Sequence, residues 1–247
     1  MGTRYRSLDV KKVIETIRHL ELRIEDRFPG SGLGKVCKEL EDLAEVTRQR
    51  IEWIKTPKLW IRIGIGSIIV LMVAILLYTI STFKVASGNF TVGDLVQISE
   101  AGLNDVVLIG AAVFFLFSVE NRVKRSRALK VLYELRAIAH VIDMHQLVKD
   151  PSRQISQNTE HSPKVDLTPA QLTRYLDYCS EMLSLTSKVG ALYAQAIDDS
   201  VVLQTVNEVE ELTTSLSQKI WQKIMVIKEL EMDQQPNDPL RPASANS

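Results

Sequence analysis

The chain has 247 residues, in which 30 Lys and Arg side chains balance 30 Asp and Glu side chains. A general nucleic-acid binder needs a net basic surface, so this balance argues against nucleic acid as a partner. Only two cysteines occur, Cys37 and Cys179, and each lies among apolar residues of a separate helical pattern, which favours core positions over a disulfide framework or a zinc site. The first six residues carry no apolar stretch, so no cleaved signal peptide is expected there.

The segment at residues 1–56 is predicted to form a cytosolic N-terminal helical hairpin. Apolar residues recur at intervals of three and four over residues 8–28 and again over residues 33–54, which is the spacing of amphipathic helices. Residues 29–32, Pro-Gly-Ser-Gly, separate the two patterns. A turn this short indicates that the two helices run antiparallel.

A first transmembrane helix is predicted at residues 57–82. Residues 63–80 contain no charged side chain and would span about 27 Å as a helix, which is close to the hydrocarbon thickness of a bilayer. Thr56 followed by Pro57 is a typical helix start. A short extracytoplasmic loop is expected to follow at residues 83–104.

The second transmembrane helix, predicted at residues 105–121, is less apolar. Its uncharged stretch, residues 106–119, would span only about 21 Å, so the helix must include polar residues at one end. Asn104 and Asp105 are the candidates at the outer end, and an Asp near the bilayer centre costs about 2.5–3.5 kcal/mol. The favoured interpretation is that Asp105 caps the helix at the interface. The other is that Asn104 and Asp105 are membrane-embedded polar groups that line a path.

Basic residues flank both predicted spans on the sides away from the connecting loop, which has only Lys84. By the positive-inside rule both termini are then cytosolic, and a bacterial inner membrane is the expected location. The cluster after the second span also predicts a lipid-headgroup site, at about 1 kcal/mol for each basic residue near an anionic surface. The members of this cluster are Arg122, Lys124, Arg125, Arg127 and Lys130.

The remaining chain is predicted to be cytosolic. Residues 122–150 extend the second membrane helix, and residues 151–167 read as a polar linker. A helical pair is expected at residues 168–232, beginning at Thr168 and interrupted at Asp198-Asp199-Ser200. Its last helix repeats apolar residues close to the coiled-coil period of about 3.5. The stripe consists of Val202, Val206, Val209, Leu212, Leu216, Ile220, Ile224, Ile227 and Leu230, and a disordered tail at residues 233–247 is expected after it.

No residue pattern in the sequence predicts a catalytic or metal-binding site. His140 and His145 are five residues apart, so on a helix they point about 140° away from each other, and Asp143 does not complete a metal-ligand set. Asp198 and Asp199 are adjacent and diverge, which favours capping over paired-carboxylate catalysis. No phosphate-binding loop or nucleophile motif is present. We therefore expect no catalytic residue, no metal and no cofactor.

Together these patterns predict an all-α fold: a two-span transmembrane helical hairpin with a cytosolic helical bundle. The predicted function is a non-enzymatic, membrane-anchored scaffold, adaptor or regulatory subunit that acts in the cytosol. Its expected partners are the lipid bilayer and either further copies of the chain or a helical protein. The alternative is a small oligomeric channel or transport component whose second membrane helix lines the path.

Overall fold

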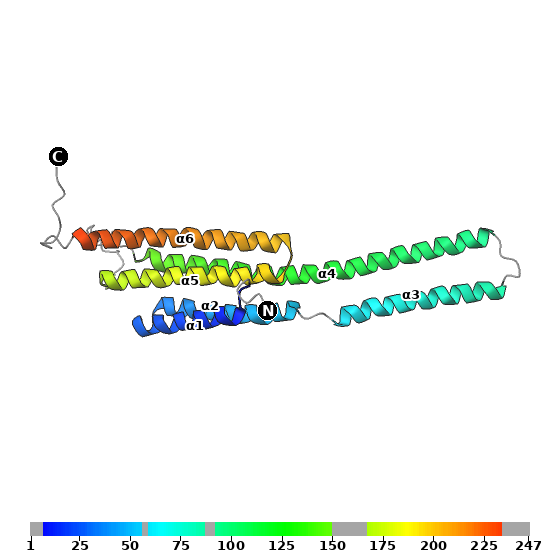
Figure 1. The fold of residues 1–247 in the computed structure, drawn as a ribbon, viewed down its shortest axis with the longest axis horizontal. Helices are drawn as coiled ribbons and strands as arrows, with labels where there is room; N and C mark the ends of the chain where they lie inside the picture. Colours follow the sequence, from blue (N-terminus) through cyan, green and yellow to red (C-terminus); the bar gives the residue numbers. More distant parts are fainter. Residues whose placement is uncertain (1–6, 56–58, 87–91, 150–166, 234–247) are drawn as a thin grey trace, which may run out of the picture. The chain divides into compact units, whose positions relative to one another are not determined.

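The computed structural model describes residues 7–55, 59–86, 92–149 and 167–233, and every regular element within them is an α-helix (Figure 1). The predicted all-α class is therefore confirmed for the described chain. The predicted linker at 151–167 and tail at 233–247 lie almost entirely outside these residues, as does the proposed start at Thr56-Pro57. The helices are α1 (Val10–Arg27), α2 (Gly32–Lys55), α3 (Leu59–Ala86), α4 (Val92–Leu147), α5 (Pro169–Ala196) and α6 (Ser200–Asp233).

The chain divides into two units, one made of Met1–Trp53 with Arg127–Ser247 and the other of Ile54–Ser126. The first unit, called the bundle below, holds α1, α2, the C-terminal part of α4, α5 and α6. Its buried apolar side chains form one hydrophobic core drawn from all five helices. The second unit holds α3 and the N-terminal part of α4.

Helices α1 and α2 form an antiparallel hairpin at the predicted position. The Asp9 side chain caps α1 by accepting a hydrogen bond from the Lys11 backbone N–H at 2.9 Å. The turn after α1 contains Gly30 at φ +67°, a left-handed conformation that residues with a Cβ rarely adopt. The direction of α2 follows from its contacts, because Glu41 near its middle bonds Arg18 of α1 at 2.8 Å while its first turn packs against the end of α1.

Helix α5 is the central helix of the bundle. Its N-terminus carries a complete capping box, in which the Thr168 hydroxyl accepts from the Gln171 N–H and the Gln171 side chain accepts from the Thr168 N–H. Its buried side chains lie around most of the helix circumference, as expected for a helix that is covered on nearly every side. At Gly190, α5 packs against Leu132 of α4 and Val209 of α6, and a Cβ there would lie 3.8 Å from both side chains, an ordinary contact distance.

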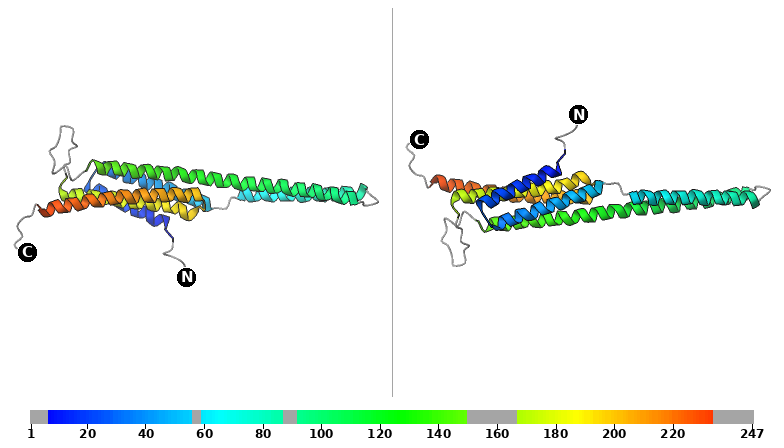
Figure 2. Two further views of the ribbon diagram at one scale, coloured as in Figure 1. Left: turned by 90° about the horizontal axis from the view of Figure 1, so that it is seen from above. Right: turned by 90° about the horizontal axis from the view of Figure 1, so that it is seen from below.

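Helix α6 runs alongside α5, and both views in Figure 2 keep the two helices adjacent. The side chain of Asp199 caps α6 by accepting from the N–H groups of Val201 and Val202, which confirms the predicted break. Every residue of the predicted α6 stripe is buried or partly buried. Trp221 and Met225 lie beside the stripe and remain 55% and 59% exposed, so they widen its apolar surface without joining the core.

In the second unit the helices are longer than the sequence predicted. Helix α3 continues to Ala86 and α4 already begins at Val92, so most of the expected loop at residues 83–104 is helical. No proline interrupts this stretch, and Gly93 and Gly102 cost only about 1 kcal/mol each inside a helix. The capping interpretation of Asp105 is therefore wrong, because Asp105 lies several turns inside α4.

Both helices of this unit expose apolar side chains, among them Val70 on α3 and Phe114 on α4, at 70% and 75%. Among the described residues one helical stretch, Gly102–Leu147, is long and apolar enough to cross a membrane. A shorter apolar stretch, Gly66–Ile75, lies within α3.

Candidate functional site

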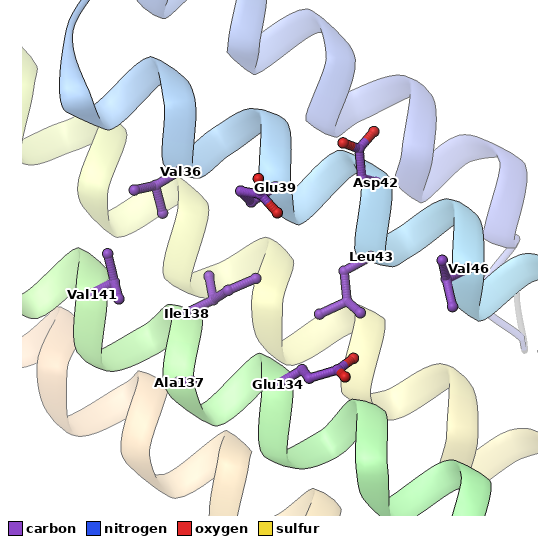
Figure 3. A pocket seen from close by; sticks show the side chains of 9 residues that line it. All are labelled: Val36, Glu39, Asp42, Leu43, Val46, Glu134, Ala137, Ile138 and Val141. Atoms are coloured by element: carbon purple, nitrogen blue, oxygen red, sulfur yellow. The ribbon is translucent and has the colours of Figure 1, made fainter.

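An open groove of about 420 Å³ lies between α2 and α4 in the bundle (Figure 3). Its apolar surface comes from both helices, and the side chains reach toward one another from the two sides. The described residues that line it are Val36, Glu39, Asp42, Leu43 and Val46 of α2 with Glu134, Ala137, Ile138 and Val141 of α4.

The charged side chains that line this groove are all carboxylates. Glu39 and Asp42 come from α2, and Glu134 comes from α4. On α2, Lys38 Nζ lies 4.0 Å from Asp42 Oδ1. No lysine or arginine is among the described lining residues, so the groove combines an apolar floor with an acidic rim.

The groove exists because α2 and α4 each carry a second apolar face. On α2 the core-facing side chains include Cys37, Leu40 and Ala44, all fully buried. Val36 and Leu43 are seven residues apart, so they share a face that is rotated away from this core stripe. They remain partly buried, because no described element covers the space between α2 and α4.

Sequence reasoning missed the groove because it treated the apolar residues of α2 as one stripe. The signal was present in the spacing, since Val36, Glu39, Leu43 and Val46 follow intervals of three and four with acidic residues interspersed. What the spacing could not give is that α4 would lie across from them at Ile138.

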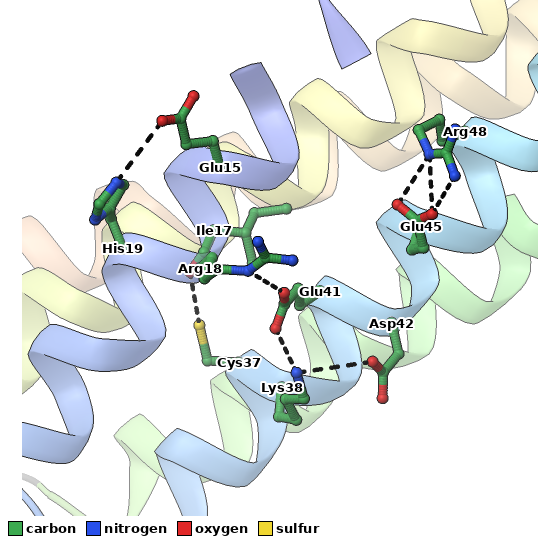
Figure 4. Close-up of polar contacts among 10 residues, drawn as sticks. All are labelled: Glu15, Ile17, Arg18, His19, Cys37, Lys38, Glu41, Asp42, Glu45 and Arg48. Atoms are coloured by element: carbon green, nitrogen blue, oxygen red, sulfur yellow. Dashed lines mark hydrogen bonds and ion pairs between the residues drawn. The ribbon is translucent and has the colours of Figure 1, made fainter. Parts of the chain in front are cut away.

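The α1–α2 hairpin contains a buried carboxylate, Glu41, which is only 5% exposed (Figure 4). Lys38 Nζ lies 2.6 Å from one of its oxygens, and Arg18 Nε donates to the other at 2.8 Å. The hydrogen bond from Lys38, and then that from Arg18, lowers the pKa of Glu41 although burial acts in the opposite direction. The bundle therefore holds Glu41 ionised between two cations.

This geometry predicts an acid-sensitive contribution to stability. Because the folded-state pKa of Glu41 lies below its unfolded value of about 4.3, the contribution is present above that value and is lost as the pH falls through the folded pKa. We expect Glu41→Gln to weaken the decline of the urea midpoint between about pH 5 and pH 3, relative to the unaltered chain. The matched control is Glu211→Gln, an exposed carboxylate on α6; an equal effect of both substitutions would contradict the assignment.

The predicted lipid-headgroup residues lie along α4. In the bundle, the Arg127 guanidinium lies 4.2 Å from the ring centroid of Trp53, and Arg50 Nη1 donates to the Arg127 carbonyl at 3.0 Å. Lys130 is exposed beside them. The other three lie in the second unit, where Lys124 pairs with Glu120 at 2.6 Å while Arg122 and Arg125 are exposed. Arg127 and Lys124 therefore contact other residues of the chain. Lipid-headgroup binding by the five basic residues stays a prediction.

Of the two predicted membrane-polar residues, Asn104 and Asp105, the structure describes only the side chain of Asn104. Asn104 is exposed on α4. The side chains of Asp105 and Lys84 lie outside what the structure describes, so the suggested pairing between them stays a prediction.

The residues considered for metal binding have other contacts. Asp143 Oδ1 accepts from Gln146 Nε2 at 2.5 Å, and His145 Nδ1 lies 3.5 Å from the Tyr175 hydroxyl, whereas His140 is exposed. Burial, followed by the charge of Lys149, lowers the pKa of His145, which favours its neutral form. In the described part of the chain no three His, Cys, Asp or Glu side chains are grouped to hold a metal ion.

The two thiols are poor nucleophiles. Cys37 and Cys179 are fully buried, and burial raises the pKa of each thiol to about 12. A thiol with such a pKa carries almost no reactive thiolate near neutral pH. The cysteines therefore act as small apolar residues of the core.

Comparison with known proteins found no match for this chain among family models, curated proteins or solved structures.

Proposed function

We propose that this chain is a membrane-anchored helical module that acts as a scaffold, adaptor or regulatory subunit in the cytosol and performs no catalysis itself. The observation that carries the proposal is α4, a single helix from Val92 to Leu147. Its N-terminal part exposes large apolar side chains such as Val107 and Phe115, while its C-terminal part contributes Leu132 and Leu135 to the bundle core. One element thus belongs both to an apolar surface suited to lipid and to a packed polar-surfaced bundle.

The two-span hairpin is part of this proposal. Helix α3 has 28 residues and would reach about 42 Å, which exceeds the thickness of a bilayer core. Its exposed side chains include Val70, Leu71 and Leu77, which water would hydrate unfavourably and lipid would accept. With α3 and α4 as the two spans, the basic flanks favour cytosolic termini, and the simplest setting is a bacterial inner membrane.

Cysteine labelling in intact cells tests the topology. We expect a membrane-impermeant maleimide to modify Asn89→Cys in intact cells and to modify Ser215→Cys, on the bundle surface, only after lysis. Cys37 and Cys179 provide little background because they are buried and protonated. Labelling of position 89 only from the cytosolic side would contradict the two-span hairpin.

The scaffold proposal and the channel alternative predict different ion flux across a membrane. Purified chain in vesicles is expected to pass no ions above the background of protein-free vesicles. Ion flux that changes with Asp105→Asn would favour the channel instead, because a side chain lining the path sets the electrostatics of permeation.

A further inference from the structure

We propose that the groove between α2 and α4 docks a basic amphipathic helix of a partner protein. This proposal rests on the scaffold function and names the chemistry of its partner: apolar side chains along one helix face, with lysine or arginine on both flanks of that face. Helix-in-groove binding of this kind uses apolar anchors at positions i, i+3 or i+4, and i+7.

The dimensions of the groove fit such an anchor set. Along α2 the lining residues run from Val36 to Val46, about 15 Å at 1.5 Å per residue. Anchors at positions i, i+4 and i+7 of a docked helix span about 10 Å. A volume of about 420 Å³ takes side chains rather than a whole helix, so the partner would lie over the groove and insert its anchors between Leu43 and Ile138.

The charges of the groove select a basic partner. Carboxylates stand on both sides of the apolar floor, with Glu39 on α2 and Glu134 on α4, whereas the Asp42 carboxylate points away from α4 in Figure 3. A helix with cations on both flanks can pair with each side at once, whereas an acidic helix would place like charges face to face. Lys38 offsets part of the charge of Asp42, at 4.0 Å, so Glu39 and Glu134 are the better probes of selectivity.

The chain offers one competing occupant, which is a second copy of itself. Trp221, Met225 and Met232 are exposed and share one face of α6 at intervals of four and seven. The only lysine on that face is Lys228, and Glu229 follows it directly. This stripe therefore lacks the positive charge that the acidic rim favours, and we assign the groove to a partner helix.

The test uses the full chain in nanodiscs of zwitterionic lipid and a designed helical peptide as probe. The peptide has leucine at the anchor positions, lysine on both flanks, and blocked ends; its matched control has glutamate in place of each lysine. Binding is read as protection of an introduced cysteine from a maleimide. Val141→Cys places the thiol in the groove, and Val201→Cys is the control, because the two valines are 39% and 40% exposed.

We expect the lysine peptide to slow labelling at position 141 by about tenfold at saturation and to leave position 201 unchanged, with no protection by the glutamate peptide. Reversal of the rim by Glu39→Lys with Glu134→Lys is expected to weaken binding about tenfold or more, because each attraction becomes a repulsion. Glu211→Lys with Glu231→Lys, on exposed α6 positions, is the control for net charge.

Three results would overturn the proposal: equal protection at both positions, equal protection by both peptides, or no effect of the rim reversal. A fourth is protection of position 141 that rises with protein density without peptide and is relieved by Trp221→Glu, which would assign the groove to a second copy. The peptide is also labelled with a fluorophore, and its binding to the chain without an introduced cysteine is measured by fluorescence anisotropy. Equal affinities would show that the cysteine variants bind the peptide as the unaltered protein does. None of these readouts depends on topology. Peptide binding at the groove can therefore fail while the membrane-anchored scaffold stands, and the labelling of positions 89 and 215 tests the membrane anchor separately.

Discussion

Replacing Leu216 and Ile220 together by Asp is expected to abolish cooperative unfolding of the bundle. Both side chains are buried in the core, at 4% and 0% exposed. Truncation of such a residue alone costs about 2–5 kcal/mol, and an unpaired buried charge adds to that cost. Because a domain has only about 5–15 kcal/mol of stability in total, two such changes are expected to unfold it.

The measurement is limited proteolysis with near-ultraviolet circular dichroism of the full chain in detergent, since helix content alone would include α3 and the apolar part of α4. Ser215→Asp with Gln218→Asp adds the same charges at exposed positions of α6 and is expected to leave the bundle resistant. If the double core variant melted and resisted protease as the unaltered chain does, the α6 stripe would not be a packing face.

Removal of the Tyr193 side chain is expected to have the next largest effect. Tyr193 of α5 is fully buried, and its hydroxyl donates to Thr47 Oγ1 of α2 at 3.4 Å. Tyr193→Ala should therefore lower the free energy of unfolding by about 3–5 kcal/mol through lost packing. Tyr193→Phe keeps the ring and removes only the hydroxyl with its polar contacts to Thr47 and Arg50, at about 0.5–1.5 kcal/mol for each hydrogen bond lost.

Urea titration of the full chain, followed by near-ultraviolet circular dichroism, separates the two contributions. An equal loss in both variants would show that the hydroxyl, rather than the packing of the ring, carries the effect. Thr47→Val is the companion variant, because it removes the acceptor while keeping a similar volume. Thr47→Val also removes the hydrogen bond that the Thr47 hydroxyl donates to the Leu43 carbonyl at 2.8 Å, so its loss should be of the same order as that of Tyr193→Phe and far below that of Tyr193→Ala.

Much of the fold followed from the spacing of apolar residues. The stripe from Val202 to Leu230 is the buried face of α6, and the breaks at Thr168 and Asp199 are the caps that start α5 and α6. These features are local, because a cap satisfies backbone groups within its own turn and a stripe is fixed by helix periodicity.

The sequence-based predictions were wrong or incomplete where local signals were weak, or where the packing of a second helix determines which residues are buried. The start of α4 was placed too late because glycine and polar residues at 93–104 were read as a loop, although they only weaken a helix. The groove was not foreseen because Val36 and Leu43 have the periodicity of core residues. Which of two apolar faces is covered depends on where α4 and α5 pack, and the spacing within α2 carries no information about that.

The position of α5 in the chain has a consequence for synthesis. The hydroxyl of Tyr193 meets Thr47 across 146 residues, and Leu8 donates its backbone N–H to Gln195 across 187. At about 5–20 residues per second a ribosome needs about 7–30 s to reach Tyr193 after Thr47. During that interval α1 and α2 have emerged with apolar faces, including Ile17 and Leu40, whose central packing partner does not yet exist. The apolar faces of the nascent hairpin therefore stay without this packing partner until the fifth helix is made, which is the interval in which exposed apolar surface favours aggregation.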